Sequence, residues 1–314
     1  MFAMRDNNFN GTRLNLNQQQ SMNTKNLIFS GLLCCSLLVP VSPIKALAQS
    51  SAAPAIQSTQ STEQIDEGWW SSLPKEKKML YTNLGAATFI TLYGLVDWDY
   101  GSGGLHTADE GWFEKDSKYG GADKFGHFWS TYALSDALTA LYTSYGYDSD
   151  KANNYAALSA WAVQAFMEIG DATSETPGFS IEDMVMNTIG SLTSVLMNRY
   201  PELDRKIDFR VEYEFNVSIN GLFDDYSNQY YAMVLKLDGF DALENTWLKW
   251  VELHGGYYSR GYDTDEVERE RSFYAGITFN FSRFFDSYGH HKTSKTLEYL
   301  QIPYTVPKVS HSLD

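Results

Sequence analysis

Cysteine is nearly absent from this chain of 314 residues, which holds only Cys34 and Cys35. Both lie inside an apolar run near the N-terminus. Removal of that run would leave a chain without cysteine, which could form no disulfide bond in an oxidising compartment. The preceding letters, GLL and LLC, also lack the small residue expected before a lipid-modified cysteine, so both positions fit lipid anchoring poorly.

Basic residues are scarce as well. The formal net charge is −15, and no stripe of lysine and arginine is present to neutralise phosphates, which excludes nucleic acid as a partner. Charged residues make up only 20% of the chain and aromatic residues 15%, which favours an aromatic-rich sheet or a membrane-facing surface over a highly charged cytosolic enzyme. The 43% hydrophobic content suffices for one or two domains with a sizeable core.

The N-terminal region has the order of a secretory signal. Lys25 precedes the apolar run 27–41, and an A-x-A pattern ends at Ala48. We therefore predict a signal peptide over 1–48 and export from the cytoplasm. A membrane anchor is the alternative, but the run is short for a span. Residues 49–74, rich at first in Ser, Ala, Gln and Thr, are predicted to form a disordered spacer.

Hydrophobic periodicity predicts an α+β fold. A helical pattern over 75–205 indicates a bundle of about four helices. Within it, the uncharged stretch Met79–Val96 is equally consistent with a membrane span and with a buried core helix. The period changes to two after residue 206, which predicts a small antiparallel sheet of about four strands over 206–286. The last residues, 287–314, are predicted to be an extended tail.

The run RSFYAGITFNFSRFF shows the strand alternation most clearly. One face carries apolar side chains, namely Phe273, Ala275, Ile277 and Phe279. The other carries Ser272, Tyr274, Thr278 and Asn280. We expect the apolar face of this sheet to pack on the helices or on a lipid surface.

Polar side chains recur in pairs near the ends of three predicted helices, and antiparallel packing would bring some of these ends together. The predicted buried network comprises Asp123, Lys124, His127, Gln164, Glu168, Asp171, Asp183 and Asn187. Several of these residues have a simpler, structural interpretation. Asp123 and the SIED sequence at 180–183 could be helix caps, Asn187 an interhelical amide and His127 a core histidine. A structural interpretation is harder for Glu168 and Asp171, which lie at the C-terminal end of a predicted helix. The negative end of the helix dipole disfavours carboxylates at that end unless a partner holds them.

These residues also carry a resemblance. The segments EGWFEKDSKYGGADKFGHFWSTY, MEIGDATSETPGFSIEDMVMNTIGS and IDFRVEY are similar to the YfiM-like family of predicted periplasmic lipoproteins of Gram-negative bacteria, a family of unknown function. The likeness covers roughly 111–283. It implies a location in the periplasm or at the outer membrane. The family's shared polar residues fall on Asp123, Lys124, His127, Glu168, Asp171, Ser180 and Asp183.

Two functional hypotheses follow. The favoured one is a non-catalytic envelope protein whose polar network holds the bundle in register, while its aromatic sheet contacts the membrane, an outer-membrane component or an unidentified protein. The alternative is an envelope hydrolase acting on lipid or another envelope substrate. Its catalytic candidates would be His127, Glu168, Asp171 and Asp183, with His127 and Glu168 acting as metal ligands or as a general base and its orienting acid. No cofactor is predicted, although a divalent metal ion is compatible with these side chains, and an all-oxygen site would favour magnesium or calcium. A G-x-S-x-G nucleophile turn is missing.

Overall fold

The computed structural model describes four stretches of the chain: residues 68–176, 178–214, 225–262 and 267–314. The predicted signal peptide, most of the predicted spacer and both cysteines lie outside the described residues. The chain divides into two compact units, and the first comprises Met1–Ser72 with Ser218–Asp224. Only residues 68–72 of this unit are described. All helices and strands below belong to the second unit.

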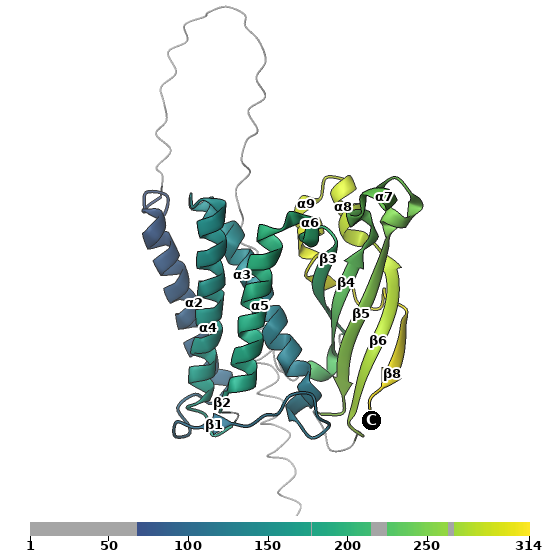
Figure 1. Cartoon of the computed structure of the whole chain (residues 1–314). Helices are drawn as coiled ribbons and strands as arrows, with labels where there is room; N and C mark the ends of the chain where they lie inside the picture. Colours follow the sequence, from purple (N-terminus) through teal and green to yellow (C-terminus); the bar gives the residue numbers. More distant parts are fainter. Residues whose placement is uncertain (1–67, 177, 215–224, 263–266) are drawn as a thin grey trace, which may run out of the picture. The chain divides into compact units, whose positions relative to one another are not determined.

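Four long helices form the predicted bundle (Figure 1): α2 (Lys75–Asp97), α3 (Ala122–Ser144), α4 (Ser149–Asp171) and α5 (Ile181–Arg199). α3 packs against both α4 and α5, which pack against each other, and α2 contacts α4. Side-chain caps fix two of the helix starts. Asp148 accepts a hydrogen bond from the Lys151 amide, and the Ser180 hydroxyl accepts one from the Asp183 amide.

The structure distinguishes between the two interpretations of the apolar stretch in α2. Only 11% of its most apolar window is buried, so α2 is not a core helix of this bundle. Its exposed large apolar side chains include Leu80, Leu84, Leu92, Leu95 and Val96. By length and composition, α2 could cross a membrane.

A long loop from α2 to α3 is tied to the start of α5. Its strand β1 (Thr107–Ala108) pairs in parallel with β2 (Phe179–Ser180), which directly precedes α5. The loop ends in the 3-10 turn η1 (Lys118–Gly121). Gly121 has a φ of +82°, and a Cβ there would lie 2.4 Å from the Trp112 carbonyl oxygen, so the turn into α3 requires glycine.

A six-stranded sheet follows the bundle, in the order β7-β3-β4-β5-β6-β8. Its strands are β3 (Ile207–Tyr213), β4 (Gln229–Lys236), β5 (Val251–Arg260), β6 (Glu270–Phe279), β7 (Leu300–Gln301) and β8 (Lys308–Ser312). All neighbouring pairs are antiparallel except β3 and β7, which are parallel. The short connecting segments are α6 (Pro201–Asp204), η2 (Tyr226–Asn228), η3 (Leu237–Gly239), α7 (Asp241–Glu244), η4 (Trp247–Trp250), α8 (Phe281–Ser287) and α9 (His291–Thr296).

The α+β prediction is confirmed, but the last segment requires a correction. The predicted extended tail over 287–314 contains the helix α9 and the strands β7 and β8, which raise the strand number from about four to six. These two strands pair with the outer edges of β3 and β6 and so satisfy edge hydrogen bonds. Pro303 and Pro307 lie between them, where no ladder donor is needed.

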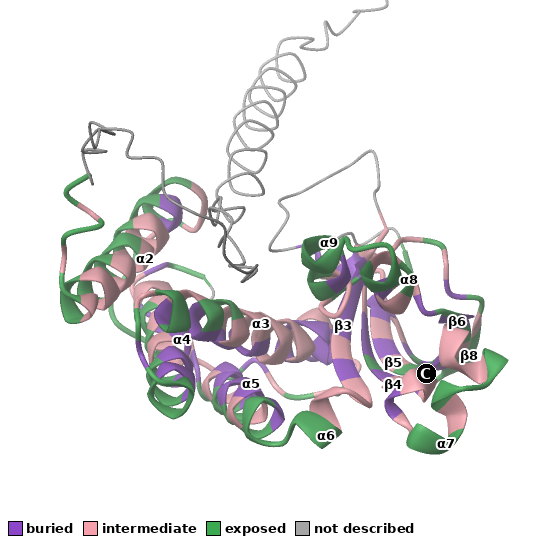
Figure 2. Cartoon of the chain, turned by 90° about the horizontal axis from the view of Figure 1, so that it is seen from above, coloured by how far each residue is buried: buried purple, intermediate pink, exposed green. Residues whose placement is uncertain are grey.

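The apolar face of the six-stranded sheet is only partly covered by the bundle. Part of the apolar face packs on α3, where Val211, Tyr231 and Tyr257 meet Phe125 and Trp129. The remainder is exposed and includes Met233, Leu253, Phe273, Ile277 and Val309. Figure 2 colours each described residue of the chain by its burial.

In β6, the polar face is the buried one. Ser272, Tyr274 and Thr278 are all buried, opposite to what the apolar alternation of β6 suggests. Residues 301–308 cover this face: the Thr278 hydroxyl donates to the Thr305 carbonyl at 2.8 Å, and Glu212 accepts from the Tyr304 amide at 2.9 Å. Buried ion pairs, among them Arg210 with Glu252 at 2.7 Å, make this polar interior possible.

Candidate functional site

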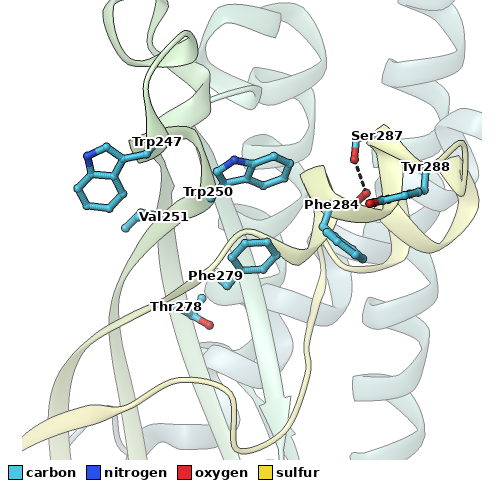
Figure 3. A pocket seen from close by; sticks show the side chains of 8 residues that line it. All are labelled: Trp247, Trp250, Val251, Thr278, Phe279, Phe284, Ser287 and Tyr288. Carbon is cyan, nitrogen blue, oxygen red and sulfur yellow. Dashed lines mark hydrogen bonds between the residues drawn. The ribbon is translucent and has the colours of Figure 1, made fainter.

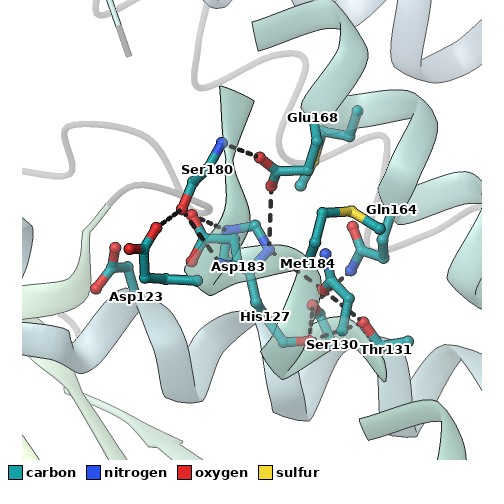
Figure 4. A network of polar contacts seen from close by, with 12 residues as sticks. Asp123, His127, Ser130, Thr131, Gln164, Glu168, Ser180, Asp183 and Met184 are labelled. Carbon is teal, nitrogen blue, oxygen red and sulfur yellow. Dashed lines mark hydrogen bonds and ion pairs between the residues drawn. The ribbon is translucent and has the colours of Figure 1, made fainter. Parts of the chain in front are cut away.

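The candidate site lies where three helix ends meet (Figure 4). The first turns of α3 and α5 and the last turns of α4 bring their polar side chains to one end of the bundle. β1–β2 pairing holds the preceding loop against the start of α5, and this loop contributes Glu110. Residues from four separate chain segments therefore converge in one buried cluster.

Lys124 is the centre of one half of the cluster. Its ammonium group lies 2.8 Å from Glu110 Oε2, 2.9 Å from Asp123 Oδ2 and 2.8 Å from Asp183 Oδ1. The lysine is fully buried, and Glu110 also pairs with Lys118 at 2.6 Å. A buried ammonium group is stable only with such partners, so these contacts join α3, α5 and the loop electrostatically.

His127 is the centre of the other half. Its Nδ1 lies 3.6 Å from Glu168 Oε1, and its Nε2 lies 3.6 Å from Asp183 Oδ2. Nδ1 also lies 3.3 Å from the Asn187 side-chain oxygen, which accepts a hydrogen bond from the Thr131 hydroxyl at 2.8 Å. Glu168 is held from its other side, because its Oε2 accepts the Ser180 amide at 3.2 Å.

Two predicted residues occupy the margin of this cluster. Gln164 lies one turn before Glu168 and donates to the Ser130 hydroxyl at 2.7 Å rather than to a carboxylate. Asp171 is the last residue of α4 and is half-buried; its negative charge contributes to the raised pKa of Glu168. The structure thus gathers Asp123, Lys124, His127, Glu168, Asp183 and Asn187 at the centre, with these two beside them.

Sequence reasoning missed Glu110 and Lys118. Both belong to the glycine-rich loop before α3, where no periodicity marks an inward-facing side chain. Glu110 is nevertheless only 7% exposed and contacts both lysines. The signal that could have found it is its position inside the EGWFEKDSK segment, which belongs to the blocks that carry the family resemblance.

Burial dominates the electrostatics of the site. It raises the pKa of Glu168 to about 9, helped by the charges of Asp183 and Asp171, and raises that of Asp123 to about 7 although Lys124 opposes the shift. Burial also lowers the pKa of His127. For Asp183, His127 and Lys124 outweigh burial and lower the pKa. The cluster therefore contains carboxyl groups with pKa values displaced in opposite directions, an arrangement suited to proton exchange or to cation binding.

A second candidate is an aromatic pocket at the sheet end of the chain (Figure 3). It has a volume of about 810 Å³, and its wall includes Trp247, Trp250, Phe279, Phe284 and Tyr288. The Trp250 and Phe279 rings stack with centroids 5.5 Å apart. Trp247 and Tyr288 are 73% and 70% exposed, so the pocket is bordered by accessible aromatic rings that suit an apolar or amphipathic contact.

The fold and site together define an α+β protein with a buried ionic cluster inside its helical bundle. Residues 109–199 match a family model described as "Predicted periplasmic lipoprotein (DUF2279)". This range contains α3, α4, α5 and all residues of the cluster, whereas the sheet lies outside it. No curated protein and no solved structure gave a significant match. The match confirms the resemblance drawn from the sequence and the exported, envelope-associated location.

Proposed function

We propose that this envelope protein is a membrane-bound binding or structural protein, whose bundle contacts lipid through its outer surface while the buried ionic cluster keeps its helices in register. The observation that carries this proposal is the inverted polarity of the bundle. Many polar side chains lie in its interior beside a small apolar cluster around Leu138 and Tyr142, and many large apolar side chains lie on its outside.

The outer surface of α5 shows the inversion most clearly. Ile181, Val185, Ile189, Leu192 and Leu196 follow a helical spacing and are all exposed, Ile181 and Leu192 by 62% each. In water such a stripe would normally face a protein core. α4 continues the surface with Leu158, Phe166 and Ile169, and α2 is exposed along most of its apolar length. This is far more than the scattered apolar residues usual on a soluble monomer.

The interior of the bundle has the complementary composition. Thr131, Ser135, Asn153, Asn187 and Ser194 are all buried between the helices. Small and polar residues at helix contacts are typical of bundles in lipid, where apolar side chains gain nothing from turning inward. At Gly190 of α5, an added Cβ would lie 2.3 Å from the Phe128 carbonyl oxygen, so only glycine permits this close helix approach.

The sheet supports the same proposal independently. Its exposed apolar strip and the tryptophan and tyrosine rings at the aromatic pocket are the side chains found where protein meets the membrane–water interface. A bilayer is therefore the partner we propose for both regions.

Lipid contact can be tested by fluorescence quenching. A chain with Cys34 and Cys35 replaced by serine receives one new cysteine, either Leu192→Cys on the α5 stripe or the control Glu175→Cys in an exposed loop. Each is labelled with an environment-sensitive dye and reconstituted into phosphatidylcholine vesicles containing nitroxide-labelled lipid. We expect strong quenching at position 192 and little at position 175. Equal, weak quenching at both positions would contradict lipid contact.

A hydrolase is the second candidate, favoured by the placement of His127 between two carboxylates. In that case His127 would act as a general base, oriented by Asp183 or Glu168. Replacement of His127 by glutamine would then abolish an envelope phenotype while the melting temperature changes little. A structural role predicts a lower melting temperature from the same change.

A further inference from the structure

The two carboxylates around His127 share an unusual arrangement. Each has one oxygen bound by the protein and the other directed at the imidazole. Glu168 Oε2 accepts the Ser180 amide at 3.2 Å, and Asp183 Oδ1 accepts the Lys124 ammonium at 2.8 Å. The second oxygens, Glu168 Oε1 and Asp183 Oδ2, lie 3.6 Å from the two nitrogens of His127.

Glu168 Oε1 is the atom that this arrangement leaves unexplained. Glu168 is 1% exposed, and among the described residues no donor forms a hydrogen bond with this oxygen. Figure 4 shows that it points toward His127. A buried carboxylate oxygen without a donor costs free energy, which a bound cation at this position would offset.

We propose that His127, Glu168 and Asp183 bind a divalent transition-metal ion. One ligand atom from each of the three residues lies within 4.8 Å of the other two. Tetrahedral coordination with bonds of about 2.1 Å separates neighbouring ligand atoms by about 3.4 Å, so small side-chain movements would complete the site. Lipid contact does not require this ion, and the proposal is therefore independent of the proposed function.

The identity of the ligands selects the class of metal. An imidazole nitrogen with two carboxylate oxygens suits zinc, manganese or iron better than magnesium or calcium, which prefer oxygen alone. Only one nitrogen of His127 can bind one ion. The other would retain a hydrogen-bond partner, and Asn187 Oδ1, 3.3 Å from Nδ1, is suitably placed for that role.

Charge balance supports the same site. Among the described residues, the centre of the cluster holds four carboxyl groups, Glu110, Asp123, Glu168 and Asp183, and two ammonium groups, Lys118 and Lys124. When all four carboxyl groups are ionised, as metal binding requires of Glu168 and Asp183, a divalent ion beside His127 would supply the two missing positive charges. The alternative trio of Glu110, Asp123 and Asp183 is not a candidate, because Lys124 already binds all three.

Metal content measured on the full exported protein tests the proposal. The protein, purified in detergent and freed of any polyhistidine tag, is stripped with EDTA, incubated with zinc, desalted and analysed by mass spectrometry for metal. We expect about one zinc ion per chain and a higher melting temperature with zinc. We expect no retained magnesium or calcium from parallel incubations. Absence of retained zinc, or retention of calcium or magnesium in its place, would overturn the proposal.

Matched variants locate the ion. His127→Gln and Glu168→Gln should weaken zinc binding at least tenfold. The exposed neighbours His106→Gln and Glu175→Gln should retain the affinity of the parent chain. Far-UV circular dichroism verifies that each variant is folded. If the folded His127→Gln variant binds zinc as tightly as the parent, the assignment is wrong; if that variant does not fold, Glu168→Gln decides by the same criterion.

Discussion

His254 of β5 gives the sharpest test of the finding that the polar face of the sheet is buried. It lies on the buried polar face, only 4% exposed, and among the described residues its Nε2 has no hydrogen-bond partner. Burial, together with the positive charges of Arg210 on β3 and Lys308 on β8, lowers its pKa to about 3. The folded protein therefore holds a neutral imidazole at pH values where an unfolded chain, with the ordinary pKa of 6.5, binds a proton.

The sign and size of the effect follow from linkage. Because the unfolded state binds more protons below pH 6.5, the free energy of unfolding falls as the pH decreases toward 3. For one group with these two pKa values, lowering the pH from 6.5 to 4.5 removes about 2 kcal/mol of stability. Replacing His254 by asparagine removes this titration, so the variant should lose about 2 kcal/mol less than the parent over the same interval.

Urea unfolding in the purification detergent, followed by tryptophan fluorescence at several pH values, measures the difference. The carboxyl groups of the ionic cluster are present in both chains, so their contributions cancel when the two profiles are subtracted. His290→Asn, at an exposed histidine, is the control and should follow the parent chain. If the unfolding free energies of the parent and His254→Asn depend on pH in the same way, His254 is accessible to protons. The assignment of a buried polar face would then be wrong.

Three further predictions concern other regions. Lys124→Met leaves three buried carboxylates without their shared cation and should cost about 3–5 kcal/mol of unfolding free energy. Because Asp183→Asn removes one of those charges, the double variant should lose less stability than the sum of the two single variants. Additive losses would refute the coupling. Thr278→Val removes the hydrogen bond to the Thr305 carbonyl and should cost about 1 kcal/mol in urea unfolding. Ile277→Thr on the exposed face should change stability by less than about 0.5 kcal/mol. The reverse order of the two effects would refute the assigned faces of the strand. N-terminal sequencing of envelope protein should find Gln49 first, and an uncleaved chain would contradict the predicted signal peptide.

Periodicity predicts the helices and the four longer strands of this fold because it reports directly on backbone geometry. The bundle of about four helices predicted over 75–205 corresponds to α2, α3, α4 and α5. The same pattern cannot say which face of a strand is buried. In β6 the polar face is inside because residues 301–308, far along the chain, supply its partners. Short strands such as β7 are equally invisible, since two residues hold no period.

The site is predictable to the extent that its residues lie on helices. Paired polar residues pointed to His127, Glu168 and Asp183, because residues three or four positions apart lie on the same face of a helix. Glu110 comes from a loop whose path depends on the pairing of β1 with β2, and nothing local in the sequence encodes that pairing. The exact partners also depend on tertiary packing, which places Gln164 against Ser130 and not against Glu168.

The ionic cluster and the apolar exterior are two results of one helical pattern. On α5 the apolar residues Ile181, Val185, Ile189, Leu192 and Leu196 alternate with the inward polar residues Asp183, Asn187, Ser191 and Ser194 at the same helical spacing. If the outer stripe faces lipid, burial of apolar surface cannot hold the helices together, because lipid tails are as apolar as leucine. Directional contacts must then fix the register, and a lysine bound by three carboxylates from α3, α5 and the preceding loop provides them at the end where these segments meet. Disrupting Lys124 should therefore loosen helix packing while the secondary structure persists.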